Sequence, residues 1–306
     1  MVRHHLLMAD TATRRDLADP DTIVRFGRAV RDTERLDLLY ALTVADSRAT
    51  SPAAWRSTKA ALCRVLFAET DTLFTAGVAG PSAAAERQAV LERHRPLLES
   101  RELAVEWSEW EPGLVECTVA ARDRRGLLAT VAGVLTLIGF DIQSASGYGD
   151  ADTGMALEVY RGVDRFGRLD EAGRRDFVTM LRSALDGALP LRTRLSERIS
   201  RYRGAGGARD RNVDVRVDVD ASSSATVIEV HAPDDVGLLA SVAAVFADLG
   251  VDVSVALVST TGERAVDVFY IRDAHGAKPT DPMLLQRIRA TLIARLTTEY
   301  VLPVPR

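Results

Sequence analysis

The sequence lacks several features that would place it in a specialised class. Its only two cysteines, Cys63 and Cys117, have no spacing typical of a zinc site or a disulfide framework, which favours a reducing cytoplasm. A net charge of -4 excludes a general attraction to nucleic acid or to anionic membranes. No apolar run approaches the ~20 residues that span a bilayer, and residues 1–10 contain no signal-peptide core. We therefore predict a cytoplasmic protein without a nucleic-acid or membrane partner.

What the chain has is size, ordinary composition and an internal repeat. Its 306 residues are enough for two or three cores, and 47% apolar with 27% charged residues is typical of soluble globular proteins. Residues 126–129 (Gly-Leu-Leu-Ala) return as residues 237–240, and Asp123 returns as Asp234 at the same offset. Two copies of one folding unit therefore stand in tandem.

Apolar periodicity divides the chain into a helical head and two mixed units. Residues 1–75 follow helical spacing throughout, with Asp19-Pro20 as a start signal. From Ala104 the period changes to two, and each unit reads strand, helix, strand, strand, helix. We predict an α+β protein in which an all-α head precedes two ferredoxin-like βαββαβ domains, with residues 300–302 as the last strand. The predicted segments are 1–75 (head), 76–103 (linker and short helix), 104–196 (first unit), 197–212 (linker) and 213–303 (second unit).

In both units the first strand ends in Asp-x-x-Gly just before a helix. A helix N-terminus offers free N–H groups and positive potential to an anion such as a carboxylate, and glycine permits close approach. Asp123 or Asp234 would then accept a hydrogen bond from an ammonium group, so the turn would read both ends of a free amino acid. The alternative is that each aspartate only caps its helix.

Asp-x-x-Gly-Leu-Leu, a helix, Gly-x-Asp and two strands resemble the ACT domain family, whose members often bind amino acids and control an attached enzyme. The resemblance implies pairing of the two units, within the chain or in a homodimer. The effector contacts that it implies are Asp123, Gly126, Leu127 and Leu128, and Asp234, Gly237, Leu238 and Leu239. Gln143, Ser144 and Ser254, on the strand after the helix, are further candidates for reading a side-chain amide, although strand residues also turn outward to solvent.

Residues 262–270 resemble the last ACT domain of one family, the protein-PII uridylyltransferase/uridylyl-removing enzymes. In the head, residues 2–8, 13–20, 42–46 and 55–59 resemble the later part of the HD phosphohydrolase domain of that family. The resemblance implies UMP transfer from UTP to the PII signal protein, hydrolytic removal of UMP, and L-glutamine as the effector that acts on the ACT domains. It also implies a divalent metal, Mg or Mn, in the intact enzyme.

By the same resemblance, Asp46 corresponds to the last metal ligand of the HD set, and His4 and His5 to a histidine pair near that metal. From the residues alone, Asp46 shares the apolar face of its helix with Leu39 and Leu42. A carboxylate there needs a metal, an arginine partner or exposure near the helix end.

The departures from the family are as informative as the matches. The sequence contains no His-Asp dipeptide and no Gly-Ser motif followed by paired aspartates, so the early HD ligands and the nucleotidyltransferase domain are missing. We therefore expect the C-terminal part of such an enzyme, without transferase activity and with little or no hydrolase activity. The alternatives are a free-standing amino-acid-binding ACT protein without catalysis and an HD-ACT relative of the alarmone synthetase/hydrolases.

Overall fold

The computed structural model describes residues 5–15, 17, 19–50, 57–76, 83–111, 113–203, 212–261 and 264–297. The chain divides into two compact units. One comprises residues 1–95 with 111–113 and 220–223, and the other comprises 96–110, 114–219 and 224–306. Among the helices of the described residues, none is long and apolar enough to cross a membrane.

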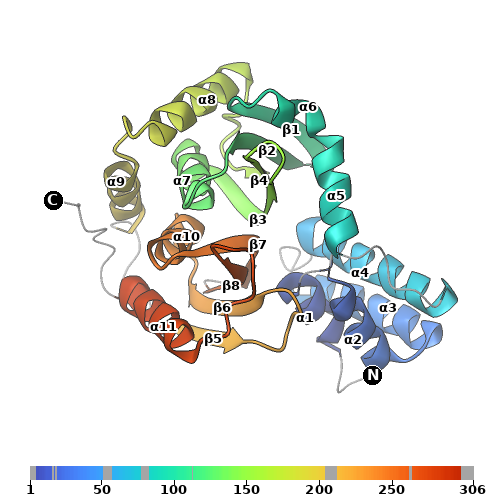
Figure 1. Cartoon of the computed structure of the whole chain (residues 1–306). Coiled ribbons are helices and arrows are strands. Elements are labelled where there is room, and N and C mark those ends of the chain that lie inside the picture. Colours follow the sequence, from blue (N-terminus) through green and yellow to red (C-terminus); the bar gives the residue numbers. More distant parts are fainter. Residues whose placement is uncertain are drawn as a thin grey trace. The chain divides into compact units, whose positions relative to one another are not determined.

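The first unit is helical, as predicted (Figure 1). Its helices are α1 (Leu7–Arg14), α2 (Pro20–Val30), α3 (Thr33–Thr50), α4 (Ser57–Ala76) and α5 (Ala83–Arg93). Asp19 caps α2 by accepting a hydrogen bond from the Asp21 N–H at 3.0 Å, and Pro20 occupies the first turn, which confirms the predicted start signal. Buried Ile23, Phe26 and Leu36 belong to the core of this unit.

The second unit is built on one eight-stranded sheet in the order β1-β2-β4-β3-β7-β8-β6-β5. The strands are β1 (Ala104–Glu111), β2 (Leu114–Arg122), β3 (Phe140–Asp150), β4 (Met155–Asp164), β5 (Asp214–Asp218), β6 (Thr226–Pro233), β7 (Val251–Thr261) and β8 (Arg264–Asp273). The order reads the same from both ends once β1 to β4 are matched with β5 to β8. The sequence repeat is therefore a structural repeat about the line between β3 and β7.

The two repeats join edge to edge within the chain. Residues 144–146 of β3 pair antiparallel with residues 255–257 of β7. This pairing covers the edge strand of each repeat, which would otherwise present unpaired backbone groups. The expected pairing of the two units is thus observed inside one chain.

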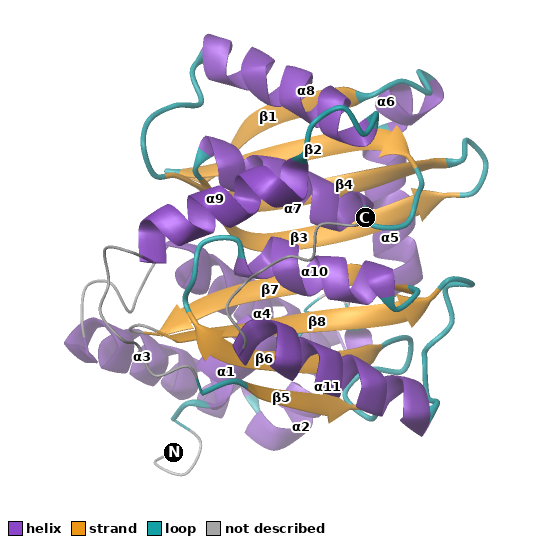
Figure 2. Cartoon of the chain, turned by 90° about the vertical axis from the view of Figure 1, so that its left-hand side faces the viewer, coloured by secondary structure: helices purple, strands orange, loops and turns teal. Residues whose placement is uncertain are grey.

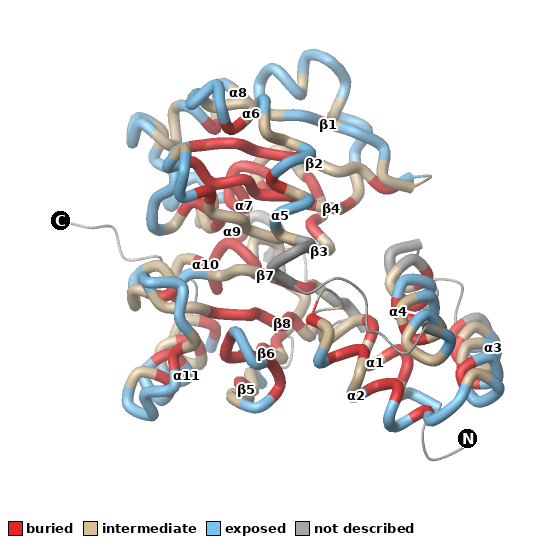
Figure 3. The backbone as a smooth tube through the Cα atoms, turned by 45° about the vertical axis from the view of Figure 1, so that its right-hand side comes forward, coloured by how far each residue is buried: buried red, intermediate tan, exposed pale blue. Residues whose placement is uncertain are grey.

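Helices cover one face of this sheet (Figure 2). They are α7 (Leu127–Ile138), α8 (Glu171–Leu185), α9 (Leu191–Arg203), α10 (Leu238–Asp248) and α11 (Pro282–Thr297). Short α6 (Arg95–Glu99) precedes β1. A single core of buried residues runs through both repeats, with α7 and α10 against the centre of the sheet (Figure 3). Burial of this continuous apolar layer stabilises the two repeats together.

Two features of the predicted fold are corrected. The extra strand of the first repeat precedes the βαββα order, as β1, and no strand lies between α8 and β5 in the described residues. In the second repeat β5 precedes the βαββα order in the same way and occupies the edge beside β6; residues 300–302 lie outside the described residues. In addition, α9 was not predicted, and it continues to Arg203 inside the segment 197–212 that was predicted as a linker.

Candidate ligand site between the two repeats

The Asp-x-x-Gly turns have the same backbone in both repeats. Gly126 and Gly237 are the N-cap residues of α7 and α10, with φ of +78° and +80°. These left-handed values favour glycine over other residues. Because these N-cap residues are glycines, they provide no side chain to cap their helices. Asp123 and Asp234 lie three residues before them, and ligand contact and helix capping both stay predictions for these aspartates.

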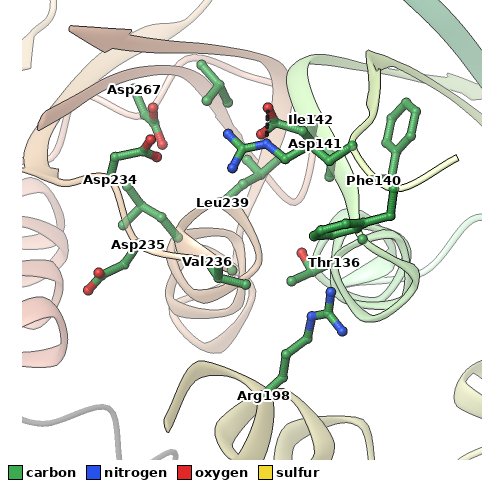
Figure 4. A pocket seen from close by; sticks show the side chains of 16 residues that line it. Thr136, Phe140, Asp141, Ile142, Arg198, Asp234, Asp235, Val236, Leu239 and Asp267 are labelled. Atoms are coloured by element: carbon green, nitrogen blue, oxygen red, sulfur yellow. Dashed lines mark hydrogen bonds and ion pairs between the residues drawn. The ribbon is translucent and has the colours of Figure 1, made fainter. Parts of the chain in front are cut away.

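The turn of the second repeat borders a cavity of about 130 Å³. Residues 234–239 form one wall, and residues 139–142 at the start of β3 in the first repeat form the opposite wall. Figure 4 shows Asp234 and Asp267 on one side of this cavity and Asp141 and Ile142 on the other. We call this cavity the Asp234 site. Because both repeats contribute to it, the site depends on the pairing of β3 with β7.

Backbone donors face this site from the beginning of α10. The Ser241 N–H makes the first i to i−4 hydrogen bond of the helix, to the Gly237 carbonyl at 3.0 Å. The Leu238 N–H donates to the Asp235 carbonyl at 3.1 Å, so the first-turn donors that suit an anion are the N–H groups of Leu239 and Ala240. Gly237 brings this turn close to its surroundings, because an added Cβ would lie 3.3 Å from Ile199 of α9.

The Asp234 site holds charges of both signs. Arg165, on the loop after β4, forms an ion pair with Asp141 at 2.9 Å, marked by the dashed line in Figure 4. Asp267 is fully buried, whereas Asp234 is half-buried. Arg198 of α9 approaches from below in the view of Figure 4. A polar cavity lined by both acidic and basic groups suits a small zwitterion.

The first repeat contains the equivalent of each acid. Asp123 corresponds to Asp234 and Asp252 to Asp141 by the sequence offset. Glu158 corresponds to Asp267, because the strand pairs Ala121–Ala156 and Ala232–Ala265 match the two ladders. We call these three acids the Asp123 site. The two sites are thus related by the symmetry of the sheet.

The Asp123 site differs in charge and exposure. Asp123 is exposed, and the loop after β8 carries Ala274 and His275 where the first repeat has Arg165 and Phe166. Burial raises the pKa of Glu158 to about 8, a Tyr160 hydrogen bond at 2.5 Å opposes this rise, and the Asp123 and Asp252 carboxylates add to it. Glu158 is therefore mostly protonated at neutral pH, and the arginine beside this cluster, Arg125, comes from the turn itself.

A second, larger cavity of about 310 Å³ lies in the helix layer. It is lined mainly by small residues of α7 and α10, such as Ala129 and Ala244, and by Leu191 and Leu195 of α9. Its charged residues Arg192 and Asp248 pair with each other at 3.2 Å. This cavity contains neither of the predicted aspartates.

The predicted effector residues divide between these places. Asp234, Gly237, Leu238 and Leu239 line the Asp234 site together, and Gly126 lines the cavity of the helix layer. Asp123, Leu127 and Leu128 line neither of the two cavities. The further candidates Gln143, Ser144 and Ser254 also line neither. Instead, register shifts of β3 and β7 fall at Gln143 and Ser254, and the Ser254 hydroxyl donates to the Tyr270 carbonyl at 3.1 Å.

The predicted metal residues of the head are not brought together in the described part of the chain. Asp46 is exposed on α3, which is one of the alternatives given from its position near the helix end. His5 is exposed, and His4 lies outside the described residues. No group of three or more His, Cys, Asp or Glu side chains that could hold a metal ion occurs among the residues that the structure describes. These residues alone do not fit a metal centre, so we assign no chemistry to one.

Most residues that line the Asp234 site were not identified from the sequence as ligand contacts, among them the charged Asp141, Arg165, Arg198, Asp235 and Asp267. Asp267 carried a signal, because it is a lone acid at a position of β8 whose inward neighbours Ala265 and Phe269 are core residues. Arg165 and Arg198 carried none, since a loop and an unpredicted helix place them.

Known proteins resemble this chain at two levels, over the second repeat and over nearly its whole length. Residues 221–299 match the model of the ACR family N-terminal ACT domain, so the second repeat is an ACT domain. Over nearly the whole chain, the similarity is to bifunctional uridylyltransferase/uridylyl-removing enzymes. That of Gluconobacter oxydans is 33% identical over 98% of this chain, that of Rhodospirillum rubrum 34% over 97%, and that of Streptomyces coelicolor 35% over 90%.

The chain is therefore a relative of the bifunctional uridylyltransferase/uridylyl-removing enzymes and matches their C-terminal part. It spans 36% of the length of the Gluconobacter oxydans and Rhodospirillum rubrum enzymes and 38% of the Streptomyces coelicolor enzyme. A solved aspartate kinase from Synechocystis is 16% identical with a TM-score of 0.33, covering 62% of this chain and 28% of the kinase. A similarity at that level does not establish a shared fold.

Proposed function

We propose that this chain is the glutamine-sensing regulatory part of a uridylyltransferase/uridylyl-removing enzyme, and that L-glutamine binds in the Asp234 site. The observation that carries the proposal is the position of the turn at Gly237, whose aspartate and helix N-terminus border a cavity that the other repeat also lines. A ligand in this position contacts both repeats, so its binding energy depends on how they are arranged.

The chemistry of the site favours an α-amino acid. The first turn of α10 supplies N–H donors for the α-carboxylate, and Asp234 supplies an acceptor for the α-ammonium group. The Asp123 site is the weaker candidate, because its aspartate is exposed and neither of the two cavities borders it. We therefore place the effector in the site that combines the turn of the second repeat with the strand of the first.

The remaining assignments follow from the resemblance to the family. The helices α1 to α4 would be the end of an HD phosphohydrolase domain, with Asp46, His4 and His5 as a partial site for Mg or Mn in the intact enzyme. PII would be the protein partner that receives and loses UMP, and the ACT pair would pass glutamine occupancy to those reactions. The chain alone is expected to catalyse neither reaction, because the nucleotidyltransferase motif and the early HD ligands are missing from it.

Calorimetric titration of the chain with L-glutamine tests the proposal, with L-alanine as a control ligand. Selective binding of one glutamine in the Asp234 site is expected. A parallel assay follows release of UMP from uridylylated PII with Mg²⁺ or Mn²⁺ present, and no release is expected. Absence of glutamine binding would refute the sensor role, and metal-dependent release of UMP would show that the chain is an enzyme by itself.

A further inference from the structure

Asp267 stands out among the residues of the Asp234 site because an acid is costly at its position. It lies on β8 between Val230 of β6 and Val258 of β7, and it is fully buried. Burial of a carboxylate among apolar residues requires compensation. Its side chain nevertheless lines the cavity, on the same wall as Asp234 (Figure 4).

The acids of this cavity occupy different positions. Asp141 on the opposite wall is paired with Arg165 at 2.9 Å. Asp234 belongs to the turn that precedes α10, beside the backbone donors that suit an α-carboxylate, so it is placed to accept from the ammonium group next to that carboxylate. Asp267 lies on the strand behind the turn, where the side chain of a bound amino acid would extend.

We propose that Asp267 makes the site specific for an amide-bearing amino acid: its carboxylate accepts a hydrogen bond from the side-chain amide of glutamine and repels the side-chain carboxylate of glutamate. This inference rests on the proposed function and adds the residue that determines specificity. Like charges brought together in a buried site are strongly unfavourable, whereas an amide N–H beside a carboxylate forms a charge-assisted hydrogen bond. A sensor of nitrogen status built in this way separates two ligands of nearly identical size by charge alone.

The direct test is calorimetric titration of Asp267→Asn with both L-glutamine and L-glutamate. Asparagine has the size of aspartate and carries an amide, so it can donate to a carboxylate. The preference for glutamine over glutamate is expected to fall by at least about tenfold, because glutamate is no longer repelled. The matched control is Glu158→Gln, the same change at the equivalent position of the Asp123 site, and its preference should equal that of the wild type.

Two further measurements on the wild-type chain keep the test independent of how the variant folds. Glutamate should bind more tightly as the pH falls from 7 to 5, by up to about tenfold per unit, because its side-chain carboxyl group, with a pKa of about 4.3, gains a proton that removes the repulsion. Glutamine should show no comparable gain. The γ-methyl ester of glutamate, which is neutral but lacks the N–H donor, should bind between the two.

The outcomes separate this inference from the proposed function. No glutamine binding by the wild type would overturn the proposed function itself. Glutamine binding with an unchanged preference in Asp267→Asn, including an equal weakening of two ligands that both still bind, would overturn only the role of Asp267. If the variant binds neither ligand, the pH series decides, and a glutamate affinity that stays constant from pH 7 to 5 counts against charge exclusion.

Discussion

The turn at Gly126 and the turn at Gly237 share one backbone and differ in their surroundings. Both glycines have φ near +80°, and both are the N-cap residues of their helices. The second turn is packed by Ile199 of α9 and faces a cavity with arginine and aspartate on its walls. An added Cβ at Gly126 of the first turn would lie 3.4 Å from Ala247 of α10, this turn lines the cavity of the helix layer instead, and its aspartate is exposed. Duplication of a fold therefore duplicated the turn but not the site, because the surrounding loop and helix differ.

The two repeats also differ in their buried acids, Glu158 and Asp267. The largest effect on stability is expected from Glu158. The pKa of Glu158 is raised from an ordinary 4.5 to about 8 by burial, so the folded chain keeps a proton that the unfolded chain releases. Stability should therefore be greatest below pH 4.5 with respect to this group, and should fall by roughly 1.4 kcal/mol per pH unit between about pH 5 and 8. Glu158→Gln should remove this slope.

Urea unfolding of the second unit across that pH range, followed by tryptophan fluorescence, measures the effect. Trp107 is a suitable reporter because it packs on Phe140 and Phe177, with ring centroids 5.8 and 5.3 Å apart. Glu106→Gln, an exposed change on β1, is the control and should keep the wild-type slope. Equal slopes in wild type and Glu158→Gln would show that Glu158 is ionised in the folded chain.

Replacement of the two turn aspartates is expected to separate the two sites by affinity. Asp234→Asn should weaken glutamine binding by roughly 10 to 100-fold, the value of a lost hydrogen bond between charged groups. Asp123→Asn should change it by less than about twofold, because that side chain is exposed and lines neither cavity. Calorimetry on both variants decides, and a larger loss for Asp123→Asn would move the effector to the Asp123 site.

The sequence was sufficient for those elements that local patterns control. Asp19-Pro20 began a helix, and the repeat of residues 126–129 located both turns before helices. Pairing of the two units could be expected from their open sheet edges, but not the choice of β3 and β7, because edge strands carry no sign of their partner. The residues of the Asp234 site could not all be predicted from local patterns. Arg165 and Arg198 reach the site from a loop and from α9, and only the folded chain brings them close to Gly237.

The missed helix α9 shows why basic segments mislead a sequence analysis. Its apolar residues Leu191, Leu195 and Ile199 follow helical spacing, but arginines surround them, and residues 197–212 were predicted as a linker. In the structure Leu195 and Ile199 are buried, and Leu195 approaches Gly133 of α7 closely. Tertiary packing therefore made a helix where composition suggested a joint.

Alanine at the two turn glycines should affect stability equally and binding unequally. Each substitution places a side chain at a positive φ, which costs roughly 1 to 2 kcal/mol, and the nearest atoms lie at similar distances, 3.4 Å for Gly126 and 3.3 Å for Gly237. Glutamine affinity should fall only in Gly237→Ala, because that turn borders the Asp234 site. Urea unfolding and calorimetry on the same preparations test both parts. A stability loss confined to one repeat would mean that the two turns differ in strain.

The smallest effect is expected at the ion pair that only the Asp234 site possesses. The side chain of Arg165 is 52% exposed, so its pair with Asp141 should contribute less than about 1 kcal/mol to stability. Arg165→Ala should therefore leave the urea midpoint almost unchanged, like the control Arg192→Ala, which removes another exposed pair. Its effect on ligands is more informative, because the cavity becomes more acidic and the preference for glutamine over glutamate should rise. A preference that falls instead would show that Arg165 itself receives a carboxylate of the ligand, and the difference between the two repeats would then lie in their arginines rather than in their buried acids.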